Sequence, residues 1–241
     1  MNQSIRIKRG TPEEFLFYLY EIDLPPGATI LDALEYIRTG SAPDLMYRHS
    51  CHHGSCGTCA VRINGKEVLA CLTRLDTFAD SVPTIEPLAA FKMDKDLVID
   101  PGTLFRLFPK NTSRLRTSEW TGGEINQDSD MDSNQVRPSG IERFVRFEDC
   151  IECGACISAC PVINKGWNDE SVPEVSFVGP AVLAAIHRES INCVERYDEM
   201  IELAKVPNGV GACEKHFDCS RVCPRMVYPG KHIELLRKEI L

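Results

Sequence analysis

Two segments near the start of the chain have the residue pattern of strands: polar residues alternate with Ile in the first, and aromatic and aliphatic residues fill the second. Residues 4–9 and 15–22 predict two such strands. A pattern with helical spacing follows, and it predicts a helix with Thr29 as its N-cap and Gly40 at its end. The apolar face of this helix is expected to contain Ile30, Leu31, Leu34 and Ile37.

Shorter strands are predicted beyond this helix. Residues 60–63 and 66–70 form an expected hairpin, because Asn64-Gly65 is a strong turn signal between them. A further strand is predicted at 82–86, and a cysteine-rich loop at 49–59 precedes the hairpin. The pattern therefore predicts a small mixed sheet packed on one helix.

The second half of the chain has a different character. Residues 111–140 are polar, acidic and rich in turn formers, so they are expected to form an exposed loop or linker. Amphipathic helices are predicted at 179–189, at 194–205 and from Pro229 onwards. We therefore expect two domains, 1–105 and 106–241, with strands in the first and helices in the second.

Composition narrows the class of protein. The chain has 241 residues, 43% of them hydrophobic, which suffices for one or two domains with buried cores. The N-terminus lacks the apolar region of a secretory signal, and no stretch approaches the roughly 18 apolar residues of a membrane span. A formal charge of -8 argues against a nucleic-acid partner. Twelve cysteines in a chain expected to stay in a reducing cytoplasm favour bound metal over disulfides.

The first group of cysteines lies around the predicted hairpin, and three members have the spacing C-x4-C-x2-C: Cys51, Cys56, Cys59 and Cys71. This is the spacing of a plant-type [2Fe–2S] site. One tight loop must wrap the cluster, and Gly54 and Gly57 supply the tolerance of positive φ that such a loop needs. A zinc site is the alternative, although zinc prefers paired C-x2-C knuckles and the loop contains one pair.

The second group has the bacterial ferredoxin spacing C-x2-C-x2-C-x3-C-P: Cys150, Cys153, Cys156, Cys160 and Pro161. In such runs the fourth cysteine binds the other cluster, so a complementary group is required. Cys213, Cys219 and Cys223 provide it. The crossover rule assigns one [4Fe–4S] cluster to Cys150, Cys153, Cys156 and Cys223, and the other site to Cys160, Cys213 and Cys219.

The last of these sites has three cysteines, because His216 stands where the regular run would place a fourth. Three thiolates hold three irons, so a [3Fe–4S] cluster is expected. Two roles for His216 stay open: it could bind a fourth iron, or it could fill space beside the cluster. Cys193 fits neither run and is expected to be a small buried side chain.

Residues for substrate chemistry are not identified in the sequence. We find no nucleophile–base pair with a partner, no glycine-rich phosphate loop and no flavin fingerprint. Each of the three expected clusters moves one electron. The sequence thus predicts an electron-transfer chain without catalytic residues, whose substrate chemistry lies on another subunit.

The three cysteine groups in this order resemble the iron–sulfur subunit of the succinate dehydrogenase and fumarate reductase family. The stretches Cys56-Gly57-Thr58-Cys59 and 95–100 support the resemblance, which covers nearly the whole chain. It implies the α+β class, with a β-grasp plant-type ferredoxin domain followed by an all-α helical ferredoxin domain. It also implies membership of a succinate:quinone oxidoreductase of the respiratory chain and tricarboxylic acid cycle.

The resemblance further implies partners and their cofactors. A flavoprotein catalytic subunit with FAD would interconvert succinate and fumarate, and a membrane anchor, expected to carry haem b, would handle quinone. Electrons would pass from FAD through [2Fe–2S], [4Fe–4S] and [3Fe–4S] to quinone, or in reverse. The chain is therefore expected at the cytoplasmic face of the cell membrane, held there through its partner subunits.

Four residues are candidates for the quinone end beside the [3Fe–4S] site: Pro161, Trp167, Glu214 and His216. Two positions depart from well-studied relatives. Glu214 stands where those carry His, and His52 stands where many carry Arg after the first cysteine. Trp167 is equally open to an ordinary packing role. His187 and His232, on predicted helices, are expected to be surface or packing residues.

Other functions stay open at this point. The same three clusters could serve a soluble or thiol-linked fumarate reductase, or another flavoprotein dehydrogenase, and Glu214 leaves room for that. A free ferredoxin-like carrier is a third possibility. Such a carrier should lack a large apolar patch on its helical domain, because subunits with fixed partners bury extensive apolar surface.

Overall fold

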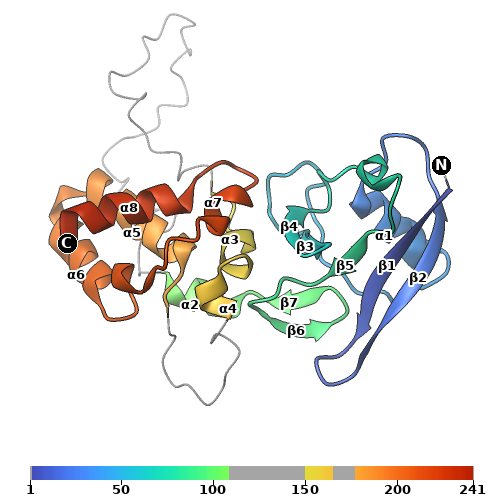
Figure 1. Cartoon of the computed structure of the whole chain (residues 1–241), viewed down its shortest axis with the longest axis horizontal. Helices are drawn as coiled ribbons and strands as arrows, with labels where there is room; N and C mark the ends of the chain where they lie inside the picture. The colour runs from blue at the N-terminus through green and yellow to red at the C-terminus, as the bar shows by residue number, and fades with distance from the viewer. Residues whose placement is uncertain (1, 109–149, 165–176, 241) are drawn as a thin grey trace, which may run out of the picture.

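The computed structural model describes residues 2–108, 150–164 and 177–240. A sheet-rich N-terminal half lies beside a helical C-terminal half along the long axis of the molecule (Figure 1), which confirms the expected α+β class. The linker predicted at 111–140 and the quinone candidate Trp167 lie outside the described residues. The domain boundary near residue 105 stays a prediction.

One mixed five-stranded sheet forms the N-terminal half, in the order β2-β1-β5-β3-β4. β1 is antiparallel to β2 and parallel to β5, and β3 is antiparallel to both β4 and β5. All the strands predicted from the sequence are present, with ends that differ by one or two residues. Their bounds are β1 Asn2–Gly10, β2 Phe15–Asp23, β3 Ala60–Ile63, β4 Lys66–Leu69 and β5 Thr84–Glu86.

Helix α1, Ile30–Thr39, packs its predicted apolar face into the same core as the sheet. Its start is a capping box: the Asp32 N–H donates to Thr29 Oγ1 over 3.2 Å, and the Thr29 N–H donates to Asp32 Oδ2 over 2.8 Å. At its end the Gly40 N–H donates to the Tyr36 carbonyl over 3.1 Å. Both predicted ends of this helix are confirmed.

A second hairpin, made of β6 Lys92–Lys95 and β7 Val98–Asp100, was not predicted from the sequence. Asp96 lies in its turn with φ at 52° and a side chain that is 1% exposed. Its carboxylate accepts hydrogen bonds from the Gly10 N–H over 2.7 Å and from the Met46 N–H over 2.9 Å. The buried carboxylate thus joins this hairpin to β1 and to the loop after α1.

Replacing Asp96 with Ala is expected to lower the free energy of unfolding by about 3–5 kcal/mol. The Arg9 Nε lies 3.1 Å from Asp96 Oδ2, so the change removes one partner of a guanidinium and the acceptor of two backbone N–H groups. Asp44 is the matched control, because it binds the same Arg9 over 2.7 Å but has a side chain that is 70% exposed. Urea unfolding that gives equal losses for D96A and D44A would contradict this account.

The helical half confirms the helices predicted at 179–189, at 194–205 and from Pro229, and it adds short ones beside the cysteines. The helices of the structure are α1 above, then α2 Gly102–Leu107, α3 Ala155–Ser158, α4 Pro161–Asn164, α5 Pro180–Asn192, α6 Tyr197–Lys205, α7 Asp218–Arg221 and α8 Pro229–Ile240. Single 3-10 turns are η1 Leu75–Phe78, η4 Val194–Arg196 and η5 Val210–Ala212.

Helix α5 is the central helix of this half, and it is buried from Pro180 to Ser190. The amphipathic pattern predicted for it is therefore wrong, because α3, α6 and α8 pack around it. His187 on α5 lies with its Nδ1 2.9 Å from Nδ1 of His232 on α8. Burial lowers the pKa of both imidazoles, that of His232 to about 3. Of the two roles expected for these histidines, packing is therefore confirmed and a place on the surface is wrong.

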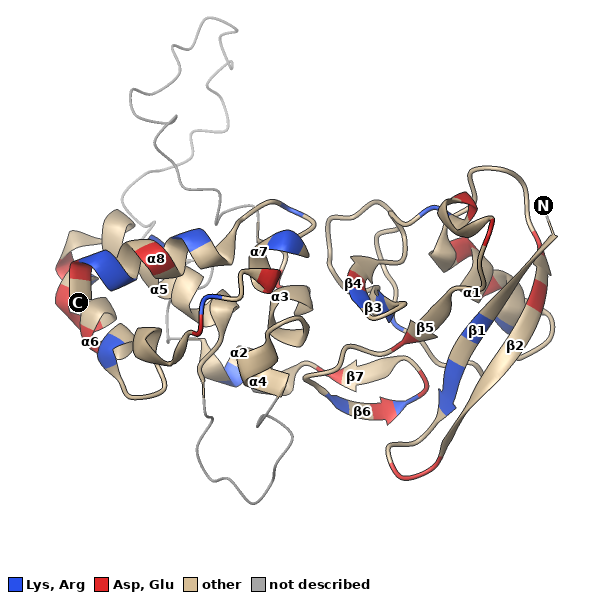
Figure 2. Ribbon diagram, viewed as in Figure 1, with Lys and Arg blue, Asp and Glu red and all other residues tan. Residues whose placement is uncertain are grey.

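A single apolar cluster runs through both halves, and it includes Leu88 and Phe91 from the first and Ile157 and Ile163 from the second. Charged residues of both signs occur on both halves (Figure 2). Among the described residues, no helix combines the length and the apolar character needed to cross a membrane. The two halves therefore share a core and meet beside the cysteine loops.

Candidate iron–sulfur cluster sites

The first cysteine group lies between α1 and the turn that follows β4. Gly54 and Gly57 have φ of 76° and 72°, which confirms the predicted need for glycine in this loop. The Ala70 N–H donates to the Cys59 carbonyl over 3.1 Å, and this bond brings Cys71 next to the loop. Cys59 and Cys71 are buried, whereas Cys51 and Cys56 are partly exposed.

Backbone donors act strongly on Cys51. The N–H groups of Ser55 and Cys56 each lie 3.3 Å from Cys51 Sγ. Hydrogen bonds from the His53 and Cys56 backbone lower the pKa of Cys51 to about 5, so this thiol is a thiolate at neutral pH. Burial has the opposite effect on Cys59, and it raises that pKa to about 12 with help from the nearby Cys71.

The second group converges as the crossover rule requires. One cavity in the helical half is lined by the three leading cysteines of the first run and by one cysteine from the other run: Cys150, Cys153, Cys156 and Cys223. Ala181 and Ala184 of α5 also line this cavity, so small side chains leave room beside the thiols. The Val227 N–H lies 3.3 Å from Cys223 Sγ. Burial raises the pKa of Cys153 to about 12.

The remaining three cysteines of the runs lie close to one another. Burial raises the pKa of Cys219 to about 11, and the charges of Cys160 and Cys213 add to the shift. The pKa of Cys160 is likewise raised by burial, with Cys213 again contributing. The pKa of Cys156 is raised by burial and, among nearby charges, by those of Cys153 in its own group and of Cys219 in the other group. The two sites are therefore neighbours.

The two runs have parallel backbone conformations. Cys153 is flanked by Glu152 and Gly154 with φ of 52° and 80°, and His216 is flanked by Lys215 and Phe217 with φ of 61° and 63°. In each run a four-residue helix follows at once, α3 after Gly154 and α7 after Phe217. His216 therefore occupies the backbone position that Cys153 has in the first run.

Positive φ at bulky residues is the feature of these sites that the sequence did not signal. Phe217, Met226 and Tyr228 have φ between 53° and 63°, a conformation that large side chains rarely adopt. His52 in the first loop has φ of 60°. Such strain persists where the surrounding structure enforces it, typically at functional sites.

The donor set fits iron–sulfur clusters. No disulfide is formed among the cysteines, all of which lie in the part of the chain that the structure describes. Within those residues, no three Cys, His, Asp or Glu side chains meet closely enough to hold one single metal ion. Thiols spread around a lined cavity, with backbone N–H groups aimed at sulfur, match the ligand shell of a cluster.

Three of the four candidates for the quinone end lie next to cysteines of the three-cysteine site or between them in sequence: Pro161, Glu214 and His216. Pro161 begins α4 directly after Cys160. His216 Nε2 lies 3.0 Å from Glu214 Oε2, and both side chains are exposed. Both roles considered for His216 stay predictions. Trp167 is outside the described residues.

Cys193 and His52 both lie at the surface of the molecule, partly or fully exposed. Cys193 is partly exposed at the end of α5, with Sγ 3.4 Å from Glu195 Oε2, so its expected burial is wrong. His52 is exposed, with Nε2 3.1 Å from His49 Nδ1. The position after the first cysteine thus presents an imidazole pair to solvent.

Two family models match the chain, and both describe iron–sulfur domains. The model of a 2Fe-2S iron-sulfur cluster binding domain matches residues 4–106. The model of a 4Fe-4S dicluster domain matches residues 146–227. These matches agree with the cluster types derived from the cysteine spacing for the first two groups.

Curated relatives and a solved structure agree with the family models. The fumarate reductase iron-sulfur subunit of Wolinella succinogenes is 32% identical over 99% of this chain and 97% of its own length. The fumarate reductase iron-sulfur subunit of Escherichia coli O6:H1 is 33% identical over 97% of this chain and 91% of its own. A chain of the Mycobacterium smegmatis Sdh1 complex in the apo form superposes with a TM-score of 0.78 at 25% identity, covering 99% of this chain and 95% of that one.

The cysteine pattern, the two halves of the fold and relatives of nearly the same length all agree. The resemblance inferred from the sequence is confirmed. The protein belongs to the family of iron–sulfur subunits of fumarate reductase and succinate dehydrogenase.

Proposed function

We propose that this chain carries single electrons between the FAD of a flavoprotein subunit and quinone at a membrane anchor. The proposed ligands are Cys51, Cys56, Cys59 and Cys71 for [2Fe–2S], Cys150, Cys153, Cys156 and Cys223 for [4Fe–4S], and Cys160, Cys213 and Cys219 for [3Fe–4S]. The grouping of the cysteines carries this proposal, because Cys223 lines the cavity of the first run while Cys160 interacts with the second. Bound clusters supply one-electron redox chemistry.

The chain's own residues hold and tune the clusters. Burial raises the pKa of Cys153 and Cys219 above that of an ordinary thiol, so iron must displace a proton at each. Backbone N–H groups at Cys51 and Cys223 stabilise negative charge on sulfur. Burial and donated hydrogen bonds are the means by which the protein sets the reduction potential.

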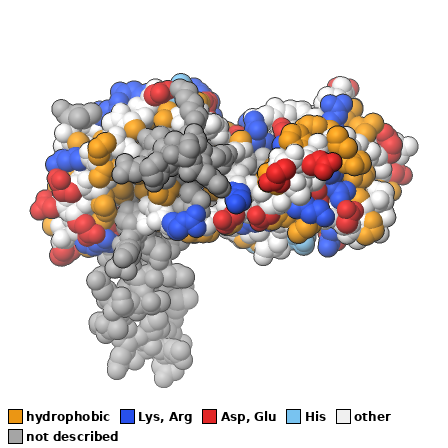
Figure 3. All heavy atoms as spheres, turned by 90° about the horizontal axis from the view of Figure 1, so that it is seen from below, with side chains coloured by type: hydrophobic (Ala, Val, Ile, Leu, Met, Phe, Trp, Pro, Cys, Tyr) orange, Lys and Arg blue, Asp and Glu red, His pale blue; other side chains and the backbone are white. Residues whose placement is uncertain are grey.

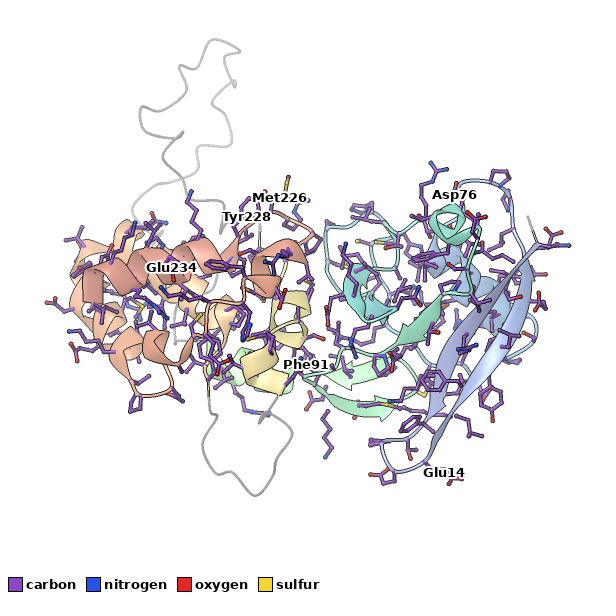
Figure 4. The ribbon with its side chains drawn as sticks, in the orientation of Figure 1. Glu14, Asp76, Phe91, Met226, Tyr228 and Glu234 are labelled. Carbon is purple, nitrogen blue, oxygen red and sulfur yellow. The ribbon has the colours of Figure 1, made fainter. Side chains whose placement is uncertain are left out.

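Partners at both ends are part of the proposal. Phe217, Met226 and Tyr228, close in sequence to Cys219 and Cys223, are 40%, 50% and 45% exposed, and Figure 4 shows Met226 and Tyr228 on the outer edge of the helical half. Apolar side chains left in water close to the proposed ligands Cys219 and Cys223 support a fixed partner over a free carrier. We assign this end to a membrane anchor, with haem b on it, at the cytoplasmic face of the membrane.

The N-terminal half also exposes apolar residues. Strand β2 is an edge strand, and its residues from Phe15 to Leu19 are each at least 43% exposed. Hydrophobic side chains gather on the half of the molecule that carries this strand (Figure 3). An edge strand of this kind is normally covered in the native assembly, which supports permanent association with a larger complex.

One observation supports an electron acceptor other than quinone beside the proposed [3Fe–4S] site. Glu214 replaces the His of well-studied relatives and forms an exposed pair with His216. A thiol-linked or soluble fumarate reductase, or another flavoprotein dehydrogenase, would use the same clusters without a quinone pocket.

Succinate-driven reduction of a quinone analogue by the natively purified complex tests the proposal. Rapid reduction that a quinone-site inhibitor blocks is the expected result. The matched assay replaces quinone with an artificial dye, which accepts electrons from the flavoprotein without needing the far end of the chain. A complex that reduces the dye with succinate but ignores every quinone would overturn the quinone assignment and favour the acceptor other than quinone.

A further inference from the structure

The segment between Cys150 and Cys160 is folded against the N-terminal half. It carries three of the four proposed [4Fe–4S] ligands, and it makes three separate contacts with the sheet domain and its hairpin. In one contact Gly57 lets two backbones come close, and in another Gly154 lets an aromatic ring approach the backbone. The third is a buried pair of hydrogen bonds.

The tightest of these contacts joins the two ligand loops themselves. Gly57 lies between Cys56 and Cys59, and a Cβ atom on it would stand 2.7 Å from Cys153 Cβ and 2.9 Å from Cys153 Cα. The same atom would stand 2.8 Å from the Ile151 carbonyl oxygen. These distances are shorter than real Cβ contacts, so only glycine permits this approach. A residue next to one proposed ligand of the first cluster thus touches a proposed ligand of the second.

A second glycine forms the matching contact from the other side. A Cβ atom on Gly154 would lie 2.8 Å from Phe91 Cζ and 3.4 Å from Leu88 Cδ1. Phe91 is buried and lies where the two halves of the molecule meet (Figure 4). The ring therefore packs directly on the backbone beside Cys153.

The third contact holds the segment in place through polar groups. The Ser158 hydroxyl donates to Glu67 Oε1 over 2.8 Å and accepts from the Ala89 N–H over 2.8 Å. Ser158 is 1% exposed and Glu67 is 5% exposed. Arg62 Nε lies 3.3 Å from Glu67 Oε1, so the buried carboxylate has a positive partner. A charge-assisted hydrogen bond in such a dry place strongly resists separation of the two halves.

We propose that Gly57 is a positioning residue for electron transfer, and that its missing side chain lets the first cluster's ligand loop contact Cys153 and pass electrons directly to it. This rests on the proposed clusters and deepens the proposed function. The step moves one electron from the reduced [2Fe–2S] centre to the oxidised [4Fe–4S] centre, or the reverse. No bond forms or breaks and no proton moves.

The physical reason is the steep dependence of electron transfer on gaps between packed atoms. Electrons cross bonded and touching atoms far faster than empty space, because the transfer rate falls exponentially with the width of a gap. A methyl group on Gly57 would separate the loops by on the order of 1 Å, since carbon atoms pack at about 3.5–4.0 Å. Contact between the loops would be replaced by a wider junction.

The test compares Gly57→Ala with Gly54→Ala in the purified complex. Gly54 is the matched control, since its φ of 76° is close to the 72° of Gly57 and it lies in the same loop. The three atoms nearest to its added Cβ all belong to the flexible Leu72 side chain, the closest 2.6 Å away, and none belongs to the other cluster loop. Two quantities are measured: the spin–spin coupling between the two reduced clusters by pulsed EPR, and the rate at which one electron introduced by pulse radiolysis equilibrates between them.

G57A is expected to show weaker coupling and to transfer the electron severalfold more slowly than G54A, which puts the same backbone strain into the same loop without a contact to the other loop. Equal coupling and equal rates in G57A and G54A would overturn the proposal. If G57A loses a cluster, Ser158→Ala tests the proposal in its place. This change loosens the contact between the same two halves by removing the hydrogen bonds of Ser158 to Glu67 and Ala89, and it adds no backbone strain. S158A should then weaken the coupling, and unchanged coupling would refute the idea. A wild-type complex without both EPR signals would instead refute the proposed clusters.

Discussion

A complex carrying Cys160→Ala is expected to lose its three-iron centre and to retain its [4Fe–4S] centre. Cys160 follows Cys150, Cys153 and Cys156 in one run, yet its pKa is raised by burial and by Cys213 of the other run. The site to which it is assigned would be left with two thiolates, which cannot hold the cluster. Iron content should fall by about three atoms per chain, and reduction of a quinone analogue should fall to background.

EPR separates the two centres, since an oxidised [3Fe–4S] cluster is paramagnetic and an oxidised [4Fe–4S] cluster is not. The air-oxidised signal should vanish in C160A, while the signal of the dithionite-reduced [4Fe–4S] centre persists. Cys193→Ala is the control, because Cys193 lies outside both runs beside Glu195 and should change neither signal. Loss of the reduced signal with survival of the oxidised one in C160A would show that the crossover assignment is wrong.

Much of the fold follows from local patterns in the sequence. The Thr29 cap and Asn64-Gly65 act through backbone geometry within a few residues, so α1 and the β3–β4 hairpin were predicted correctly. The β6–β7 hairpin was missed, because its strands are short and its turn is stabilised by Asp96 through contacts with distant Gly10 and Met46. Tertiary contacts of that kind leave no local periodicity.

The burial of helix α5 on all sides was likewise not predictable from its own sequence. Its sequence predicts one apolar face, but the helix is surrounded, and His187 is buried against His232 at neutral charge. Periodicity reports how apolar residues are spaced, whereas burial depends on how many neighbouring elements pack on the helix. A helix at the centre of its half buries polar side chains that its own sequence would assign to the surface.

The cluster types of the two domains were predictable, because ligand spacing is a short-range requirement. Three ligands on one loop must reach a common centre, so their separation along the chain is restricted. The contact between Gly57 and Cys153 was not predictable, since Gly57 has a sufficient local reason to be glycine in its φ of 72°. Only the structure shows that the same missing side chain also serves the junction between two loops from different halves.

The parallel between the two runs gives the next prediction, in which His216→Cys converts the three-iron centre into a [4Fe–4S] centre. The backbone around His216 repeats that around Cys153, with positive φ on both flanking residues and a short helix directly after. A thiol at 216 would therefore start from the position of a ligand. The paramagnetic signal of the oxidised protein should disappear, and iron content should rise by about one atom per chain.

The matched control is His216→Ser, which removes the imidazole without adding a thiol. His216 Nε2 is 3.0 Å from Glu214 Oε2, so the ring is directed at a carboxylate, and H216S is expected to keep the three-iron signal. A wild-type centre that lacks this signal and gains it in H216S would show instead that His216 binds a fourth iron. Persistence of the signal in H216C would mean that the local backbone, with Phe217 in place of the glycine beside Cys153, turns position 216 away from the site. The two variants together thus separate what the side chain at 216 does from where its backbone places it.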